Sequence, residues 1–127
     1  MEDTTPFVRT DFSDSSKWKA LLEEVSTENE MGFRAFVEPI SDSRFDSADP
    51  VDVAHEYADA VVVFVVDVHT IQTGEVLCLN GEAPTEQIRA KAKDLWVVEN
   101  NLSIGNLLFD ELVEQVGEDG VLQSLEL

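Results

Sequence analysis

The chain has few basic residues and almost no cysteine. Of its 127 residues only 8 are Lys or Arg, against 27 Asp or Glu, and the formal net charge is −19. A surface of this sign repels phosphate backbones and anionic lipids, so we expect no nucleic-acid partner and no membrane surface. Cys78 is the single cysteine, which excludes an internal disulfide.

Long apolar runs are also missing. The longest extends from Ala60 to Val66, far too short to cross a bilayer. The first residues, MEDTTPF, lack the basic-then-apolar order of a secretory signal, so we expect a soluble, cytoplasmic protein. The hydrophobic fraction of 43% nevertheless predicts a packed core in one domain over residues 1–127.

The short signatures of common enzymes are missing as well: G-x-S-x-G, the phosphate-binding loop, G-x-G-x-x-G and C-x-x-C. Cys78 lies between two leucines and is expected to be an inert core thiol. His55 and Asp59 have the i, i+4 spacing of metal ligands on a helix, but no convincing third ligand accompanies them. The acidic residues 42–52 lack the ligand spacing of a calcium loop. We therefore expect no cofactor and no metal.

Apolar periodicity predicts a βαβ unit at the start of the chain. Residues 7–12 and 32–39 are rich in β-formers and alternate, which predicts two strands. Between them a helix over residues 13–25 is predicted, with Ser13 or Asp14 as N-cap. Its apolar stripe consists of Trp18, Leu21, Leu22 and Val25. The two strands fit a right-handed parallel crossover.

The middle of the chain predicts a central strand and a hairpin. Residues 40–59 are polar and acidic, with Pro50 placed to open a short helix. Residues 60–68 form a continuous β-branched run, typical of a strand buried on both faces. Residues 75–80 and 85–92 flank a Gly- and Pro-containing turn and predict an antiparallel pair. The fold class is therefore α/β, one mixed sheet of about five strands with helices packed on it.

Asparagine is concentrated in WVVENNLSIGN, residues 96–106, although it is poor in helix and strand interiors. We expect Asp94 to cap a short helix over residues 95–100, and Asn100 and Asn101 to end it. The alternative is that these asparagines, with Glu99, line a binding surface.

The chain closes with a predicted helix over residues 107–116, capped by Asn106 and ended by Gly117. A short extended segment, residues 119–125, follows it. The best candidates for core anchors in the whole chain are two aromatic residues, Trp18 and Phe109.

Two segments carry a resemblance to a known family: VRTDFSDSSKWKALL (residues 8–22) and LWVVENNLSIGNLLFDELVEQVGEDGVLQSL (residues 95–125). They resemble a family of small, acidic, uncharacterised bacterial proteins, found mainly in actinobacteria. Its members have a similar Arg-Thr-Asp-Phe strand before a Trp-containing helix, and a similar Glu-Asn-Asn-Leu-Ser segment near the end. The family has no known activity, so the resemblance implies no function. Its pattern has Pro where this chain has Lys93.

The best candidate site lies where the central strand ends. Asp67 and His69 alternate onto one face at the carboxyl end of the predicted central strand, where α/β sheets tend to hold ligands. An adjacent aspartate also fixes a histidine tautomer for proton transfer. Arg9 and Asp11 leave the first strand in a similar way, so all four converge if the two strands are neighbours. The alternative is a set of surface ion pairs at the sheet edge.

Three functions fit these features. The first is an acidic binding or regulatory module that docks a basic protein, for example as an immunity-type inhibitor of a toxin. The second is adaptation to a salt-rich cytoplasm, in which no specific partner is needed. The third is a small-ligand protein or enzyme, which requires one pocket that joins four side chains: Arg9, Asp67, His69 and Glu99.

Overall fold

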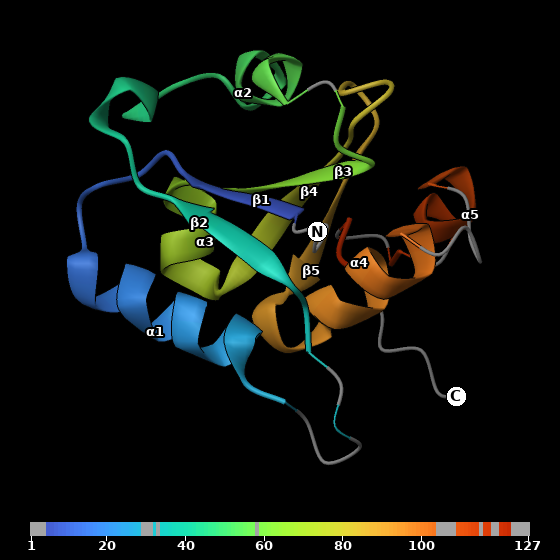
Figure 1. Cartoon of the computed structure of the whole chain (residues 1–127), viewed down its shortest axis with the longest axis horizontal. Helices are drawn as coiled ribbons and strands as arrows, with labels where there is room; N and C mark the ends of the chain where they lie inside the picture. Colours follow the sequence, from blue (N-terminus) through green and yellow to red (C-terminus); the bar gives the residue numbers. More distant parts are fainter. Residues whose placement is uncertain are drawn as a thin grey trace.

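The computed structural model describes residues 5–28, 32, 34–57, 59–103, 109–114, 116–117 and 120–122. A five-stranded mixed sheet in the order β2-β1-β3-β4-β5 forms its centre (Figure 1). This confirms the predicted fold class. The strands are β1 (Thr5–Arg9), β2 (Val37–Ile40), β3 (Val62–Val66), β4 (Glu75–Asn80) and β5 (Gln87–Lys91).

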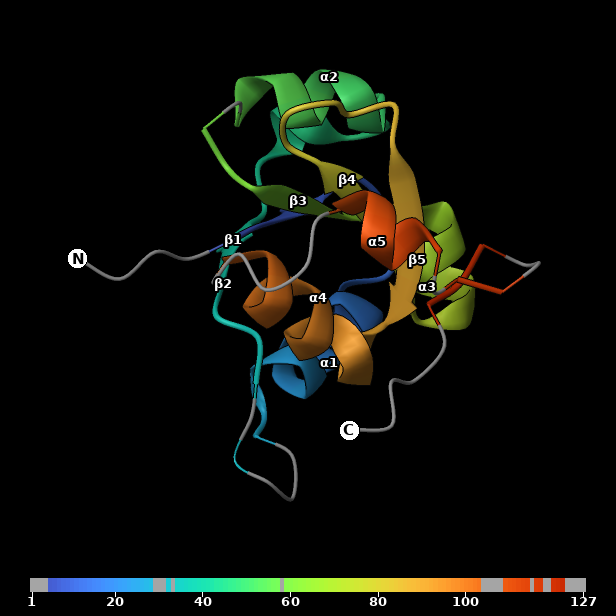
Figure 2. The same cartoon turned by 90° about the vertical axis from the view of Figure 1, so that its right-hand side faces the viewer.

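Helices cover both faces of the sheet. They are α1 (Ser15–Ser26), α2 (Pro50–Glu56), α3 (Val68–Thr73), α4 (Leu95–Ser103) and α5 (Phe109–Val113), with 3-10 turns η1 (Ser43–Phe45) and η2 (Ala92–Asp94). In Figures 1 and 2, α2 lies on one side of the sheet, and α1 and α4 lie on the other. Among the described residues, no helix is long and apolar enough to cross a membrane.

Strands are added to both flanks of β1. β1 pairs in parallel with β2 on one flank and with β3 on the other, whereas β4 and β5 continue the sheet in antiparallel fashion. The crossover from β1 to β2 contains α1, and the crossover from β2 to β3 contains α2 on the opposite face. From β1 the chain continues to β2 on one flank of the sheet, and from β3 it continues to β4 on the other flank. Such a divergence of neighbouring strands opens a crevice at their carboxyl ends.

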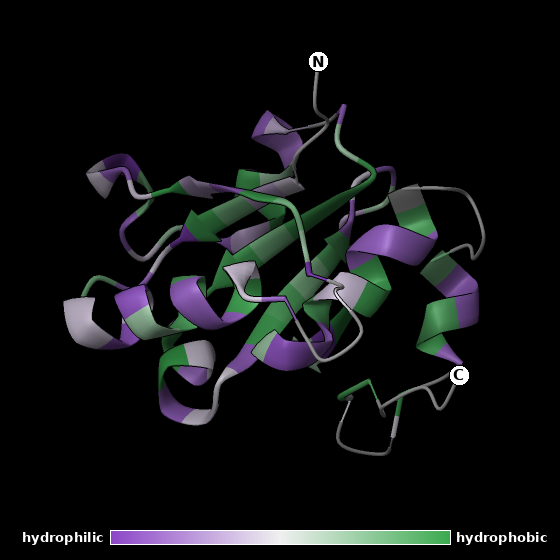
Figure 3. Cartoon of the chain, turned by 60° about the horizontal axis from the view of Figure 1, so that its bottom comes forward, coloured by the Kyte–Doolittle hydropathy of each residue, from purple (hydrophilic) through white to green (hydrophobic). Residues whose placement is uncertain are grey.

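The face covered by α1, α3, α4 and α5, here named the α1 face, holds the larger apolar cluster. Trp18 stacks on Phe7 of β1, with their ring centroids 5.4 Å apart. Trp18 and Phe109 are each 6% exposed, so both predicted core anchors are confirmed. Figure 3 shows mainly hydrophobic strands at the centre, with hydrophilic residues on the surrounding helices and loops.

The opposite face, here named the α2 face, holds a smaller cluster under η1 and α2. Alternation along the strands turns five apolar side chains to this side: Val8, Val63, Val65, Leu77 and Leu79. Phe45 of η1, with Val53 and Ala54 of α2, covers them. The predicted helix that opens at Pro50 is confirmed.

Three helices begin near the carboxyl edge of the parallel strands, and each is capped by an aspartate. The carboxylates of Asp14, Asp49 and Asp67 accept hydrogen bonds from the first-turn amides of α1, α2 and α3. The N-cap at Asp14 confirms one of the two predicted candidates. Asp67 was expected within a strand over residues 60–68. The strand ends earlier than predicted, because the Asp67 carboxylate accepts a hydrogen bond from the Thr70 amide and caps a helix.

Other strand bounds differ from the sequence prediction in a similar way. β1 ends at Arg9 rather than at residue 12, and β2 contains only the last part of the predicted strand over residues 32–39. The hairpin of β4 and β5 is confirmed, with Glu75 opposite Lys91. β5 then continues directly into η2, with Lys93 in that turn.

The predicted end of the fourth helix is wrong. α4 continues through Asn100 and Asn101 to Ser103 because its buried residues, Leu95, Val98 and Leu102 among them, pack into the core on both sides of the asparagines. Asn101 Nδ2 donates to the Val97 carbonyl at 2.7 Å, so its amide group bonds within the helix.

The predicted helix near the C-terminus is confirmed over Phe109–Val113. Gly117 is not its C-cap, because the helix ends earlier and the Gly117 amide donates to the Val121 carbonyl at 3.0 Å. Leu122 pairs with Val116, as part of the expected extended segment. The cap predicted at Asn106 lies outside the described residues.

The two outer strands differ in how their free edges are covered. β5 is bridged on its outer side by Val121. On β2, the Phe36 carbonyl accepts from the Thr5 amide, so alternate residues such as Glu38 direct their backbone groups to β1. Pro39 therefore occupies an outward-facing backbone position on the open edge of the sheet, where its missing N–H breaks no bond.

Candidate functional site

A cavity of about 650 Å³ opens at the carboxyl ends of β1 and β3. We name it the switch-point cavity. Its walls come from residues 10–13 after β1, from the connection between β2 and α2, and from Asp67 and Val68 after β3. The connection contributes Asp46, Ser47 and Ala48, and α2 contributes its first residue, Pro50. Ligands of open α/β sheets bind in the corresponding crevice, and 300–1,000 Å³ is about the usual volume of such pockets.

Backbone hydrogen bonds hold the three walls together. The Thr10 amide donates to the Val66 carbonyl at 2.9 Å, and the Ser47 amide donates to the Thr10 carbonyl at 2.8 Å. The Thr10 hydroxyl also donates to the Val66 carbonyl. Ser47 has a φ of 61°, a left-handed conformation that a non-glycine residue adopts only under local constraint. Hydrogen bonds therefore join the loops that form the cavity walls.

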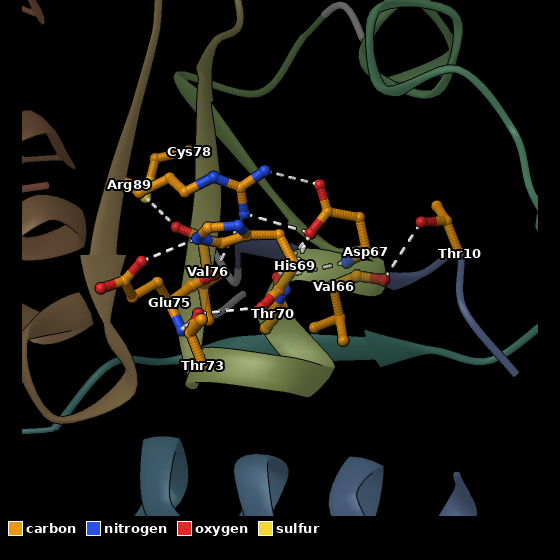
Figure 4. Close-up of polar contacts among 10 residues, drawn as sticks. All are labelled: Thr10, Val66, Asp67, His69, Thr70, Thr73, Glu75, Val76, Cys78 and Arg89. Carbon is orange, nitrogen blue, oxygen red and sulfur yellow. Dashed lines mark hydrogen bonds and ion pairs between the residues drawn. The ribbon is translucent and has the colours of Figure 1, made fainter. Parts of the chain in front are cut away.

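Asp67, one of the three carboxylates that line the cavity, is fully engaged by neighbouring groups. Arg89 Nη1 lies 3.1 Å from Asp67 Oδ1, and Arg89 Nη2 lies 2.7 Å from Asp67 Oδ2, a bidentate pair (Figure 4). Thr70 donates to Asp67 Oδ1 from its amide and its hydroxyl. Burial raises the pKa of the Asp67 carboxyl, but the bonds from Arg89 and Thr70 outweigh it, so that the pKa lies below its ordinary value.

The other two carboxylates, of Asp11 and Asp46, are available. Asp11 Oδ1 accepts from the Ser13 amide at 2.8 Å, which leaves its second oxygen for another donor. Within the described part of the chain, neither Asp11 nor Asp46 forms an ion pair with a basic side chain. The lining residues include three aspartates and no Lys or Arg.

His69 is turned away from this cavity. Its Nε2 lies 2.8 Å from Glu75 Oε1, and the Glu75 carbonyl in turn accepts from Arg89 (Figure 4). The expectation that Asp67 and His69 share a strand face is therefore wrong, because α3 begins between them. Together, Asp67, Arg89, Glu75 and His69 form a polar network that joins α3 to β4 and β5.

Arg9 lies beside the cavity but belongs to the α1 face. It is 7% exposed, and its guanidinium carbon lies 4.5 Å from the ring centroid of Phe12 and 5.5 Å from that of Trp18. Its Nη2 donates to the Ser15 hydroxyl and its Nε to the Asp11 carbonyl. Arg9 thereby fixes the backbone of the loop after β1 rather than the Asp11 carboxylate.

The candidate residues of α4 lie elsewhere. Glu99 is 7% exposed and its Oε1 accepts from the Phe36 amide at 2.8 Å, which fastens α4 to the start of β2. Asn100 is exposed on α4, and Asn101 bonds within that helix. None of the three lines the switch-point cavity.

The predicted convergence at the sheet edge is therefore realised for some residues only. β1 and β3 are neighbours, and Asp11 and Asp67 line the same cavity. Arg9 and His69 do not line it. Arg9 donates to the carbonyl of Asp11, which does line it, whereas His69 bonds to Glu75, which does not. Cys78 is fully buried, which raises the pKa of its thiol, as expected for an inert core residue.

Sequence reasoning missed Arg89 and Asp46. Arg89 lies between Ile88 and Ala90, whose side chains belong to the α1 face, so alternation alone places its guanidinium on the α2 face. No local signal identifies Asp67, 22 positions away, as its partner. Among the described residues, no group of three or more His, Cys, Asp or Glu side chains is arranged to hold a metal ion.

A family model described as a domain of unknown function, DUF6924, matches residues 4–125. It covers the sheet, the helices and every residue of the switch-point cavity. No curated protein and no solved structure matches the chain.

Proposed function

We propose that this chain, which belongs to the DUF6924 family of domains of unknown function, is a cytoplasmic binding module that docks a basic protein through its α2 face. The observation that carries the proposal is the charge of residues 38–59, which include most of β2 and all of η1 and α2. This segment has one Arg and seven exposed carboxylates: Glu38, Asp42, Asp46, Asp49, Asp52, Glu56 and Asp59.

The two faces differ in charge. Lys17, Lys19 and Lys93 belong to α1 and η2 on the α1 face, whereas Arg44 is the only Lys or Arg of residues 38–59. Arg44 lies between Asp42 and Glu56, at 3.3 Å and 2.9 Å from their carboxylate oxygens. An anionic face of this kind attracts a cationic protein over a long range and accelerates its association.

Part of this charge is held in fixed positions. Asp42 and Asp49 cap η1 and α2, and each accepts a backbone hydrogen bond. Side chains fixed before binding lose less conformational entropy when a partner docks. The face therefore suits recognition of a defined pattern of basic residues.

The test compares how much of a basic partner is captured by the unaltered protein and by two variants with altered charge. The first variant combines Glu38→Gln, Asp52→Asn and Asp59→Asn on the α2 face. The matched control combines Glu23→Gln, Glu24→Gln and Glu28→Gln on and after α1, with the same change in net charge. All six residues are exposed.

We expect the unaltered protein and the control to capture one basic protein in stoichiometric amount at moderate salt, and the α2-face variant to lose it. Recovery of no stoichiometric basic partner would count against the proposal. Equal loss in both variants would do the same, because it would show that net charge rather than this face is recognised.

Adaptation to high salt is the competing function, and exposed carboxylates on α1, such as Glu23 and Glu24, favour it. It predicts a protein whose stability rises steeply into molar salt. A catalytic use of Asp67 and His69 is not proposed, because their side chains are engaged by Arg89 and Glu75 respectively.

A further inference from the structure

We propose that the switch-point cavity receives one arginine side chain of the basic partner. The inference rests on the proposed function, since it assigns to that partner an anchor residue. The cavity adjoins the acidic segment, because Asp46, Ser47, Ala48 and Pro50 belong both to its wall and to residues 38–59. A partner seated on the α2 face over residues 38–59 therefore lies against one wall of the cavity.

The lining suits the two parts of an arginine side chain. Phe12, Ala48, Pro50 and Val68 provide apolar surface for the methylene stem. Val68 is 59% exposed although it is aliphatic, so contact with a stem would remove it from water. The polar groups of the lining are carboxylates and hydroxyls, which accept hydrogen bonds from a guanidinium.

The charges also select a cation. Asp67 is neutralised by Arg89, but Asp11 and Asp46 have no basic partner among the described residues. A guanidinium has five donors in a planar fork and pairs with carboxylates at two points. A phosphate or carboxylate ligand would be repelled, because the helix starts near this edge already carry the carboxylates of Asp14, Asp49 and Asp67.

The first experiment uses the whole chain, labelled with nitrogen-15, and N-acetyl-arginine amide as the probe. We expect saturable NMR shifts of the amides of residues 10–13, 47, 48, 67 and 68, with a dissociation constant of about 1 mM, as for a single small contact. N-acetyl-citrulline amide, which has the same shape without the charge, should bind roughly tenfold more weakly. Equal affinity for both probes, or shifts spread over the surface, would overturn the inference.

A matched pair of double variants locates the site. Asp11→Asn with Asp46→Asn removes the two free carboxylates of the cavity and keeps an acceptor for the Ser13 amide. Asp52→Asn with Asp59→Asn changes the net charge equally outside it. We expect the first pair to weaken arginine binding about tenfold and the second less than about twofold. Unchanged melting temperatures show that both proteins are folded.

The partner distinguishes this inference from the proposed function. If the captured basic protein binds the cavity variant as tightly as it binds the unaltered chain, the anchor is refuted and the docking face stands. If no basic partner is captured but the arginine probe binds, the docking function fails. The cavity is then a site for a free guanidine compound, and the assignment to a partner's side chain is overturned.

Discussion

The two faces of the sheet differ in the size of their apolar clusters and in the number of helices that cover them. On the α1 face, four helices and Leu122 enclose a continuous apolar cluster. On the α2 face, η1 and one short helix cover a smaller cluster, and a polar network of Asp67, Arg89 and Glu75 takes over beyond them. The same strands supply both clusters through alternate residues.

Apolar packing is thus concentrated on one face of the sheet and acidic residues on the other. Like charges on a folded protein repel and weaken it, so a concentration of carboxylates is tolerated only where other interactions compensate. Here the thick α1 face supplies that stability through Phe7, Trp18 and Phe64, while the thin α2 face carries the acidic segment. We therefore expect the acidic α2 face to contribute less to the free energy of folding than the α1 face.

The largest expected effect is a difference in stability between the two faces. Leu95 and Leu79 are both fully buried, one in each cluster. We expect Leu95→Ala to lower the free energy of unfolding by about 3–5 kcal/mol, because rigid helices surround the void. Leu79→Ala should cost only about 2–3 kcal/mol, since one short helix can relax into the space. Denaturant unfolding of both variants measures the difference, and equal losses would contradict the comparison.

The next effect concerns the polar network on the α2 face. Asp67→Asn should lower the free energy of unfolding by about 2 kcal/mol at neutral pH, because it removes a charge-assisted bidentate pair but leaves an acceptor for Thr70. The pKa of Asp67 is lowered in the folded protein from its ordinary value of 3.8. The pair therefore contributes fully above that value and is lost as the pH falls through the lower, folded one.

Chemical denaturation at several pH values measures this effect. The gap between the unaltered protein and Asp67→Asn should narrow as the pH falls below about 4. Arg89→Gln is the matched variant from the other side of the pair and should show the same narrowing. A gap that stays constant down to pH 2 would contradict a stabilising contribution from the ionised Asp67 carboxylate.

The smallest expected effect is the change in stability when carboxylates on each face are neutralised. In low salt, the α2-face variant Glu38→Gln, Asp52→Asn and Asp59→Asn should be more stable than the unaltered chain by about 0.5 kcal/mol, because like charges repel less. The α1 control, Glu23→Gln, Glu24→Gln and Glu28→Gln, should gain less, since Lys17 and Lys19 lie on the same helix.

A salt titration of the melting temperature completes that test. The gain of the α2-face variant should disappear by about 0.5 M salt, where exposed charges are screened. A melting temperature of the unaltered protein that keeps rising steeply into molar salt would instead favour salt adaptation over a docking face.

Much of the fold follows from local patterns. The β-branched run that forms β3, the apolar stripe of α1 and the turn between β4 and β5 each have a period or a composition that one structure satisfies. Asp14 and Pro50 mark helix starts by their own chemistry. These elements were predicted because the deciding interactions lie within a few residues.

The errors arise where a competing interaction decides the outcome. At Asp67 the β-branched pattern continues into Val68, but a capping box with Thr70 ends the strand, and Gly74 in a left-handed conformation ends the helix that follows. At Asn100 and Asn101 the weak helix propensity is overridden by packing of Leu102 in the core. In both places the residues alone allow two structures.

The candidate site follows from the sequence only in outline. Strand polarity predicts that Arg9, Asp11, Asp67 and His69 converge at one sheet edge if β1 and β3 are neighbours. The strands are neighbours, but only Asp11 and Asp67 line the cavity. Asp46 reaches the same place through the path of the β2–α2 connection, and no sequence period describes that path. The bond from the Ser47 amide to the Thr10 carbonyl is likewise a tertiary interaction.

Pro39 has a consequence for how this molecule meets other polypeptides. Because its backbone offers no donor on the outer side of β2, an extended chain from a second molecule finds the row of main-chain donors interrupted there. Val121 occupies part of the opposite border. Growth of the sheet from one protein into the next is thus discouraged at both ends. Contacts with another protein are therefore expected to be made by side chains, which differ in chemistry, rather than by main-chain hydrogen bonds.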